Sequence, residues 1–170
     1  MDYECSIIIP VFNQVGFTQK CLEALAQNTA DVHYEVIIID NGSTDGTASF
    51  LSCLEGDVKI IRNKENLGFS KANNQGSQIA EGRYLLFLNN DTIPQPDWLR
   101  HMILVQKTNS DVGIVGNKLL YPNGKIQHAG VVKDKGFYHI HENFPHDHPA
   151  VNKLRAFAKA CKDAIVPPKK

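Results

Sequence analysis

Residues 84–99 read YLLFLNNDTIPQPDWL, an apolar run that passes directly into three amide and carboxylate side chains. The five residues Tyr84 to Leu88 have the length and composition of a buried strand. Asn89, Asn90 and Asp91 follow at once, although capping the next helix would use only one such side chain. The stretch therefore predicts a buried strand that ends in a polar turn, and the other strand ends decide what that turn can do.

Four further apolar runs alternate with helical patterns along the chain. They cover residues 5–9 (CSIII), 36–39 (VIII), 58–61 (VKII) and 112–115 (VGIV). The runs are largely continuous rather than alternating, which indicates burial on both faces, as in a parallel sheet covered by helices. Strands that alternate with helices predict an α/β fold, with a mostly parallel sheet flanked by helices.

The pattern weakens toward the C-terminus. Residues 119–121 and 126–132 are predicted to be strands around a turn at Pro122-Asn123-Gly124. We expect residues 1–132 to form the α/β domain. Residues 133–170 show little periodicity, and they are expected to be an irregular loop and terminal segment of the same domain, incomplete at its C-terminus.

Polar side chains follow each of the first four apolar runs, among them Asp40, Asp45 and Asp91. Because the carboxyl ends of parallel strands meet at one edge, these residues are expected to share a rim where ligands bind. Carboxylates there can accept hydrogen bonds from a base or a ribose, and one can hold Mg²⁺ or Mn²⁺ beside a diphosphate. Two plainer interpretations stay open: Asp40 could only brace its own loop, and residues 89–91 could form only a turn.

The bulk composition excludes several classes of partner. Eighteen basic residues balance eighteen acidic ones, so nothing favours nucleic acid as a partner. No run approaches the roughly 18 apolar residues of a transmembrane segment, and the N-terminus lacks the features of a signal peptide. Four separated cysteines without a C-x-x-C pair favour reduced thiols. We therefore expect a cytoplasmic protein, either free or peripheral at the inner face of the membrane.

Four motifs in order resemble the nucleotide-binding half of family 2 glycosyltransferases, which have the GT-A fold. They are SIIIPVFN at residues 6–13, VIIIDNGSTDGT at 36–47, NKENLGFSKANNQG at 63–76, and the opening stretch at 84–99. In addition, IVGNKLLYPNGKIQHAGVV at 114–132 resembles a subgroup that builds bacterial surface polysaccharides. The likeness covers residues 4 to about 132.

This resemblance implies an inverting transferase that moves a sugar from a nucleoside diphosphate sugar to an acceptor hydroxyl. The donor would be a UDP-, dTDP- or GDP-sugar, and the acceptor a saccharide or a lipid-linked molecule. Asp91 matches the last acid of the family's D-x-D-like motif and is expected to bind Mg²⁺ or Mn²⁺ on the diphosphate, while Asp40 matches the acid that binds the base. Nucleotide-binding positions are implied at Pro10, Asn13, Asp40, Asn41, Gly42, Gly68, Lys71, Asn89 and Asn90.

The chain departs from the family pattern at the metal motif, which begins with Asn89 instead of an aspartate. An amide supplies less charge than a carboxylate, so Asp91 would need help in holding a cation. Imidazoles suit manganese passably. The candidates are His128, His139 and His141, for which a solvated loop is the plainer interpretation.

A second departure concerns the catalytic base, an acid that the family places well downstream. The nearest spare acids are Asp97, Asp134 and Glu142, and none matches the family's position. We therefore expect a donor-binding half whose base is missing from this chain, so that it binds a nucleotide weakly and transfers little or nothing.

Other functions fit the sequence less well. A non-catalytic nucleotide-sugar-binding module would use the same residues. A nucleotidyltransferase would need a basic, glycine-rich loop after the first strand, whereas residues 10–19 (PVFNQVGFTQ) hold one glycine and no arginine. A dinucleotide-binding oxidoreductase would need G-x-G-x-x-G after a strand, which is absent from the sequence.

Overall fold

The computed structural model describes residues 3–129, 131–133, 137–139 and 142–145. Its chain divides into two compact units, Met1–Arg100 and His101–Lys170, and each is described here by itself. The division predicted from the sequence, after residue 132, stays a prediction. None of the helices in the described part of the chain has both the length and the hydropathy that crossing a bilayer requires.

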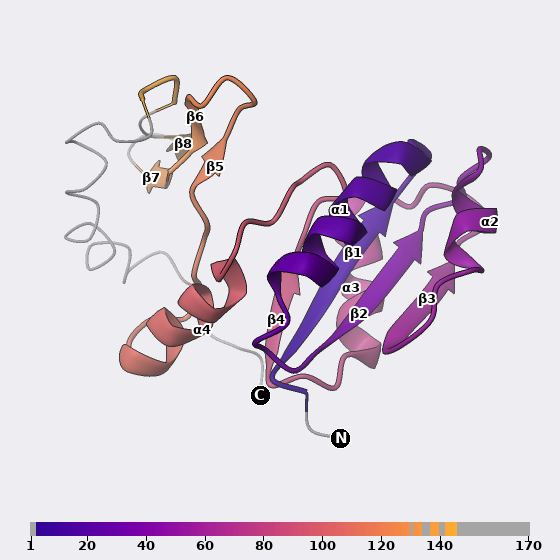
Figure 1. The fold of residues 1–170 in the computed structure, drawn as a ribbon, viewed down its shortest axis with the longest axis horizontal. Coiled ribbons are helices and arrows are strands. Elements are labelled where there is room, and N and C mark those ends of the chain that lie inside the picture. The colour runs from indigo at the N-terminus through magenta and orange to yellow at the C-terminus, as the bar shows by residue number, and fades with distance from the viewer. Residues whose placement is uncertain (1–2, 130, 134–136, 140–141, 146–170) are drawn as a thin grey trace. The chain divides into compact units, whose positions relative to one another are not determined.

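The first unit is built on a four-stranded parallel sheet in the order β3-β2-β1-β4. Its strands are β1 (Cys5–Val11), β2 (Tyr34–Asp40), β3 (Val58–Arg62) and β4 (Tyr84–Phe87). Four of the five predicted apolar runs form this sheet, so the predicted parallel α/β architecture is confirmed. All four strands point the same way (Figure 1), and their carboxyl ends therefore lie along one edge.

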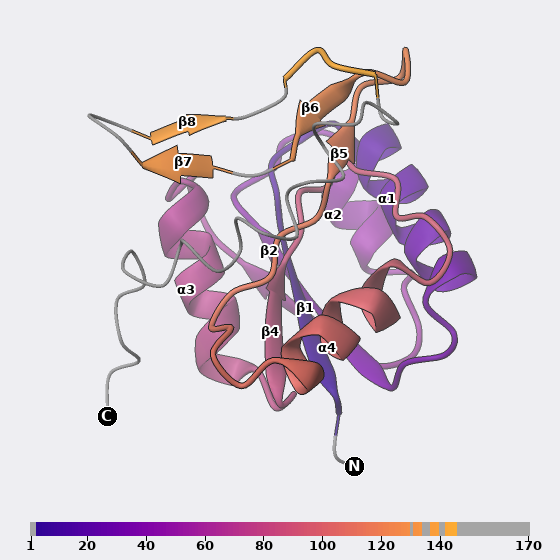
Figure 2. The same ribbon diagram turned by 90° about the vertical axis from the view of Figure 1, so that its left-hand side faces the viewer.

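Helices cover both faces of the sheet. Figures 1 and 2 show α1 (Val15–Asn28) on one face and α3 (Phe69–Ile79) on the other. The short helix α2 (Thr47–Leu51) lies on the same side as α1. A fourth helix, α4 (Trp98–Thr108), spans the boundary between the two units.

The core under α3 explains the runs of isoleucine. Ile8, Ile37 and Ile39 are fully buried and pack with Ala72 of α3 in one cluster. Helix and sheet approach so closely that a Cβ atom at Gly76 would lie 2.5 Å from a methyl group of Ile8. The small residues of α3 therefore let the helix lie flat on β1 and β2, which buries both faces of these central strands.

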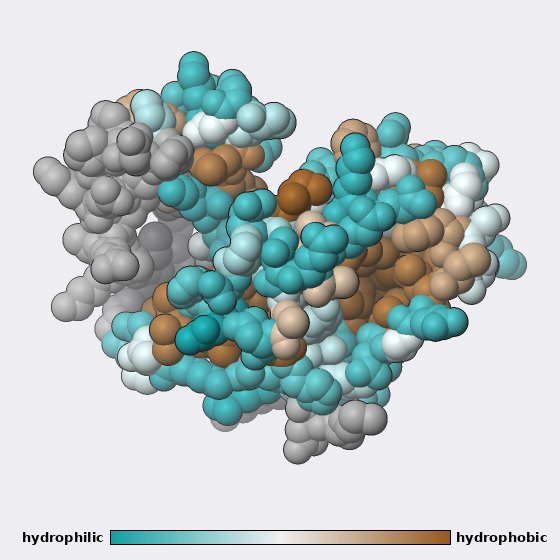
Figure 3. Space-filling model, viewed as in Figure 1, coloured by the Kyte–Doolittle hydropathy of each residue, from teal (hydrophilic) through white to brown (hydrophobic). Residues whose placement is uncertain are grey.

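Burial on both faces does not extend to the edge strands, so this part of the prediction is wrong there. On β4, Leu85 is 47% exposed and Phe87 is 52% exposed. The residues of β3 are half-buried or exposed, and Figure 3 shows apolar surface over β2 and β3 beside α1. An apolar run does not tell an edge strand from a central one, because both carry the same β-forming residues.

The second unit contains two short antiparallel pairs. In the first, β5 (Leu119–Leu120) pairs with β6 (Ile126–His128) around the predicted turn, where the Gly124 amide donates to the Tyr121 carbonyl at 2.9 Å. In the second, β7 (Val131–Lys133) pairs with β8 (Phe137–His139). The segment expected as strand over residues 126–132 thus contains β6 and most of β7, and the segment expected to be irregular from residue 133 contains β8.

Residues 112–115, predicted as a fifth buried strand, are not a strand in the structure. Ile114 is 75% exposed, and Gly113 interrupts the run with a residue that weakens strands. A four-residue run of this kind needs a neighbouring strand to satisfy its backbone, and none pairs with it among the described residues.

Candidate functional site

A pocket of about 250 Å³ lies at the carboxyl edge of the sheet in the first unit. Its lining combines the ends of β1, β2 and β4 with the segment that enters α3. The residues from the predicted motifs that line it are Pro10, Asn41, Asn66, Asn89, Asn90 and Asp91. The geometry expected from the parallel sheet is therefore present, because four distant motifs meet around one hollow.

Two aromatic side chains also line this pocket, although the sequence did not single them out. Phe12 follows β1 and is 47% exposed, and Phe69 begins α3 and is 56% exposed. Exposed aromatic rings beside polar groups suit flat, partly apolar ligands. A signal was available in the sequence, since each phenylalanine lies next to a predicted site residue, Asn13 and Gly68.

The loops after β1 and β2 are held together by Asn13. Its backbone amide donates to Ser43 Oγ at 2.8 Å, and its Oδ1 accepts from the amides of Thr44 and Asp45 at 2.8 and 3.3 Å. Asn13 takes the left-handed conformation, with φ at 56°, which asparagine tolerates better than most residues. Its carboxamide is thus engaged between the loops, and Asn13 is not among the described residues that line the pocket.

Asp45 secures the same pair of loops from the other side. Its Oδ2 accepts from the Val15 amide at 3.2 Å, where α1 begins, and its Oδ1 accepts from the amide and hydroxyl of Thr47 in α2. The Thr47 hydroxyl, followed by its amide, lowers the pKa of Asp45 below the ordinary value. Asp45 therefore positions the loops as a carboxylate and does not line the pocket.

Asp40 and Gly42 shape the turn after β2. Asp40 is only 3% exposed, and its Oδ1 accepts from the Ser43 amide at 2.9 Å. Gly42 has φ at +80°, and a Cβ atom there would lie 3.0 Å from the backbone of Glu65. The carboxylate of Asp40 thus braces its loop, it is not among the described pocket-lining residues, and its binding to a base stays a prediction.

Asn41, the residue between them, does line the pocket and is 4% exposed. Its carboxamide contacts the Gly68 carbonyl and the side chain of Asn63, which in turn bonds to Gln75 of α3. Asn63 and Gln75 lie within the motif at residues 63–76 but were not among the predicted site residues, because amides on a strand end and a helix are common on surfaces.

The segment that enters α3 is held by Asn66 and Gly68. Asn66 Oδ1 accepts from the Gly68 amide at 2.9 Å. Gly68 has φ at 80° and ψ at 167°, a region that only glycine enters readily. Lys71 is exposed on the first turn of α3 and forms no ion pair with the described residues. Asn66 and Phe69 line the pocket at the amino end of α3, and a role for Lys71 in binding stays a prediction.

The turn after β4 lies against α1. The hydroxyl of Thr92 donates to the Asn89 carbonyl at 2.7 Å, which closes the turn. Asn90 Nδ2 donates to Oγ1 of Thr18 on α1 at 3.0 Å, and Thr18 is fully buried. The side chain of Asn90 is therefore partly a brace, as the plainer interpretation of this cluster held.

Asp91 is exposed at the pocket and makes no hydrogen bond or ion pair within the described part of the chain. A carboxylate in this state is available to a cation. However, no group of three or more His, Cys, Asp or Glu residues that could hold a metal occurs among the described residues. The donor set fits Mg²⁺ or Mn²⁺ only if a ligand and water complete the shell, which is how magnesium is often held.

The candidate metal-binding histidines and the candidate catalytic acids do not line the pocket among the described residues. Asp97 faces Arg100, with 3.9 Å between Oδ1 and Nη1, and Glu142 accepts from the Tyr121 hydroxyl at 3.1 Å in the second unit. His128 is half-buried on β6. The side chain of His139, and Asp134 and His141 altogether, lie outside the described residues. Of the candidates in the described residues, Pro10, Asn41, Asn89, Asn90 and Asp91 line the pocket of the first unit, whereas His128 and Glu142 belong to the second unit.

Comparisons with known proteins agree with this fold. Over 130 residues the chain is 35% identical to the O-antigen biosynthesis protein RfbC of Myxococcus xanthus. This alignment covers 75% of this chain and 10% of RfbC. Over 125 residues it is 38% identical to the glycosyltransferase AglE of Haloferax volcanii, covering 70% of this chain and 41% of AglE. The chain thus spans less than half the length of these relatives.

Among solved structures, the mannosyltransferase PcManGT of Pyrobaculum calidifontis, in complex with GDP-Man and Mn²⁺, superposes with a TM-score of 0.59 at 20% identity. The match covers 72% of this chain and 37% of that one, and it supports the GT-A fold. Residues 6–164 match the family described as glycosyl transferase family 2. The chain therefore belongs to the family 2 glycosyltransferases.

Proposed function

We propose that this chain binds the nucleoside diphosphate sugar donor of an inverting glycosyltransferase in the pocket at the carboxyl edge of the sheet. The observation that carries the proposal is the meeting of Pro10, Asn41, Asn66 and Asp91 around one hollow of about 250 Å³. A UDP-, dTDP- or GDP-sugar offers the flat base, hydroxyl groups and diphosphate that such a mixed aromatic, amide and carboxylate lining can bind.

Asp91 is the residue that would hold Mg²⁺ or Mn²⁺ in this pocket. Its exposed carboxylate has no partner among the described residues, and the exposed Asn89 beside it offers a further oxygen. When bound, the cation would neutralise charge on the departing diphosphate. The presence of GDP-Man and Mn²⁺ with the related fold of PcManGT supports this assignment.

The remaining pocket residues would hold the nucleotide itself. Asn41 and Asn66 offer side-chain amides, and the amino end of α3 favours negative charge. Lys71 is exposed on the first turn of that helix and has no ion-pair partner among the described residues, so it would contribute to diphosphate binding by charge. Asn13, Gly42 and Gly68 would act on the nucleotide through the shape of their loops, because their contacts are with the backbone and side chains of neighbouring loops.

The acceptor would be a saccharide or lipid-linked hydroxyl, and a carboxylate would remove its proton. Asp97 is poorly suited to this role because it faces Arg100 at 3.9 Å. We therefore propose that the described residues supply donor binding, and that the base is another acid of the whole protein. The name of the relative RfbC favours synthesis of cell-envelope polysaccharide, with the donor taken from the cytoplasm.

Isothermal titration calorimetry with UDP, dTDP and GDP, with and without Mn²⁺, tests the proposal on the full chain. We expect at least one nucleotide to bind, more tightly with Mn²⁺, and Asp91→Ala to remove the effect of the metal. Glu55→Ala is the matched control, because Glu55 is exposed in the loop before β3, at the opposite end of the strands. No binding of any nucleotide by the unchanged chain would refute the proposal.

Turnover assays run beside the titrations separate two functions. Binding without sugar transfer fits a donor-binding portion or a non-catalytic nucleotide-sugar-binding module. Robust transfer by these residues would show that the base lies within them, which contradicts our assignment. Asp40→Ala separates its two roles: we expect weaker nucleotide binding that still responds to Mn²⁺, whereas an unchanged affinity would mean that Asp40 only braces its loop.

A further inference from the structure

Three side-chain amides connect the wall of the pocket with α3. Asn63 Nδ2 donates to Asn41 Oδ1 at 2.9 Å and to Gln75 Oε1 at 2.8 Å, and Gln75 Nε2 donates back to Asn63 Oδ1 at 2.9 Å. Asn63 and Gln75 therefore form a reciprocal amide pair. We call Asn41, Asn63 and Gln75 together the amide relay.

The amide relay has a fixed direction. An amide nitrogen has two protons to donate, and a carbonyl oxygen can only accept. Asn63 uses both protons of Nδ2, one on Asn41 and one on Gln75. Because Asn63 donates to Asn41 Oδ1, the other end of the Asn41 carboxamide must be its nitrogen.

The Gly68 carbonyl at the far end of the relay enforces the same direction. It lies 3.5 Å from Asn41 Nδ2, and as a backbone oxygen it cannot donate. Turning the Asn41 carboxamide over would place Oδ1 against this oxygen, so that two acceptors would face each other without a proton between them. A distance of 3.5 Å is at the long limit for a hydrogen bond, which leaves Asn41 Nδ2 with capacity for another acceptor.

We propose that Asn63 and Gln75 are positioning residues that hold Asn41 with its N–H groups available to an acceptor atom of the bound nucleotide. The proposal rests on the proposed function, since it takes the ligand of the pocket to be a nucleotide. Neither Asn63 nor Gln75 is among the described pocket-lining residues, whereas Asn41 is. Their effect on binding therefore passes through Asn41, and through the direction of its amide.

Such a device gives selectivity as well as affinity. An oxygen or ring nitrogen that accepts a hydrogen bond is favoured at this point of the pocket. A ligand group that can only donate would leave both partners unsatisfied, which costs more than the loss of an ordinary contact. Because Asn41 is 4% exposed, water cannot readily replace the missing partner.

Replacing Gln75 by methionine tests the relay, because methionine fills similar space without an amide. In the Gln75→Met chain, Asn63 can turn over, and the direction of the Asn41 carboxamide then depends only on its long contact of 3.5 Å with the Gly68 carbonyl. We expect the Kd for UDP, dTDP or GDP with Mn²⁺, whichever binds best, to rise roughly 5- to 10-fold, the effect of one net hydrogen bond. Gln78→Met is the matched control, since Gln78 is exposed on the same helix, and it should leave the Kd unchanged.

A spectroscopic measurement separates positioning from a general loss of structure. In ¹⁵N–¹H spectra, the side-chain amide signals of Asn41 should shift when nucleotide is added to the unchanged chain and to Gln78→Met. They should shift little in Gln75→Met. Asn63→Asp is the second variant, should Gln75→Met fail to fold: it keeps the size of the side chain but has no proton for Asn41 Oδ1, and it should weaken binding by a similar factor.

The outcomes distinguish this proposal from the proposed function. If the unchanged chain binds no nucleotide, the proposed function fails, and the relay loses its ligand with it. If the unchanged chain binds, but Gln75→Met and Asn63→Asp bind equally well with the same Asn41 shifts, the proposed function stands and the relay is refuted. Weaker binding in both variants, with Gln78→Met unaffected, supports the relay.

Discussion

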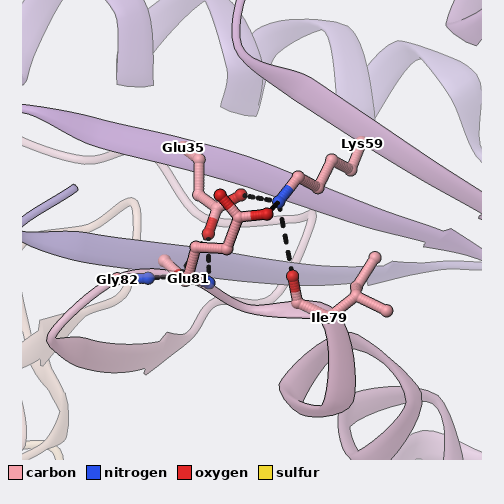
Figure 4. Close-up of polar contacts among 6 residues, drawn as sticks. Glu35, Lys59, Ile79, Glu81 and Gly82 are labelled. Carbon is pink, nitrogen blue, oxygen red and sulfur yellow. Dashed lines mark hydrogen bonds and ion pairs between the residues drawn. The ribbon is translucent and has the colours of Figure 1, made fainter. Parts of the chain in front are cut away.

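The ammonium group of Lys59 lies 2.8 Å from the carboxylate of Glu35, a residue of β2 that is 1% exposed. The same ammonium lies 2.6 Å from Glu81 and 3.3 Å from the Ile79 carbonyl at the end of α3 (Figure 4). All of these groups are near the amino ends of the strands, whereas the pocket is at the carboxyl ends. This ion-pair cluster and the pocket that we propose binds the nucleotide thus lie at opposite ends of the sheet.

Glu35 joins every strand of the sheet at this end. Its Oε1 accepts from the Ser6 hydroxyl of β1 at 2.7 Å and from the Glu81 amide, just before β4, at 2.7 Å. Its Oε2 pairs with Lys59 of β3. The Ser6 hydroxyl in turn accepts from the Gly82 amide at 2.8 Å. A carboxylate with this many partners offsets the cost of its burial.

Glu35→Gln should therefore destabilise the chain without affecting the pocket. Glutamine can keep an acceptor for Ser6 and Glu81, but it removes the charge that faces Lys59. We expect the free energy of unfolding in urea to fall by about 2 kcal/mol, the scale for disrupting a buried ion pair that is partly open to solvent. The exposed Glu55→Gln is the control and should change it little. A Kd for nucleotide that rises with Glu35→Gln in the folded chain would contradict the separation.

The pH dependence of stability should report the same carboxylate. Burial raises the pKa of Glu35, but the bonds from Lys59, Ser6 and the Glu81 amide outweigh it and leave the pKa below its ordinary value of 4.5. A lowered pKa in the folded chain stabilises it above the ordinary value, and this contribution is lost as the pH falls through the folded value. The difference in unfolding free energy between the unchanged chain and Glu35→Gln should thus have its full size above pH 4.5. It should become smaller in more acidic buffer. If this difference in unfolding free energy did not change with pH, the ion pair of Glu35 and Lys59 would not be its cause.

Gly42 should be intolerant of alanine for reasons local to the pocket. Its φ of +80° is strained for any residue with a Cβ atom, and that atom would lie 3.0 Å from the Glu65 backbone. We expect Gly42→Ala to cost about 1–3 kcal/mol of unfolding free energy and to weaken nucleotide binding, because the adjacent Asn41 would move. Thermal and urea unfolding, with calorimetric titration, measure both.

Gly16→Ala is the control for Gly42→Ala, and we expect it to have the opposite effect on stability. Gly16 lies inside α1, and a Cβ atom there would meet nothing within 4 Å. Alanine is the better helix former by roughly 0.5–1 kcal/mol, so this variant should be slightly more stable and should bind nucleotide normally. If Gly42→Ala behaved like Gly16→Ala, the turn after β2 would not constrain the pocket.

The sheet was predictable from the sequence because each strand is a local apolar run and such runs recur along the chain. Runs such as residues 36–39 are apolar throughout, and the parallel arrangement then places the polar residues that follow at one edge. The short run at 112–115 failed because four residues with a glycine carry too little of that signal. Exposure at Phe87 was also missed, since strand order is not encoded in the composition of a strand.

Within the site, the sequence located the residues but not their contacts. Asn41 and Asp91 line the pocket, whereas Asn13 and Asp40 are engaged in bracing their loops. A list of polar residues at strand ends cannot separate these two groups, because the difference lies in side-chain direction. Partners such as Gln75 come from a helix far along the chain, and only the folded arrangement pairs them with the pocket.

The hydrogen bond from Asn90 Nδ2 to Thr18 Oγ1 links helix α1 to the turn that we propose binds the metal. Thr18→Val keeps the shape of the buried side chain and removes the acceptor 3.0 Å from Asn90. We expect a loss of about 1 kcal/mol in unfolding free energy. Because the freed turn carries Asp91, we also expect a smaller enhancement of nucleotide binding by Mn²⁺.

Thr29→Val is the control for that variant, because Thr29 is equally buried and accepts from the Trp98 indole at 2.9 Å. It should lose a similar amount of stability, since it too leaves a donor without its partner. Its contact lies in the loop after α1, between residues that do not line the pocket, so binding with Mn²⁺ should be unchanged. Equal effects of Mn²⁺ in Thr18→Val and Thr29→Val would show that the turn holds Asp91 in place without help from α1.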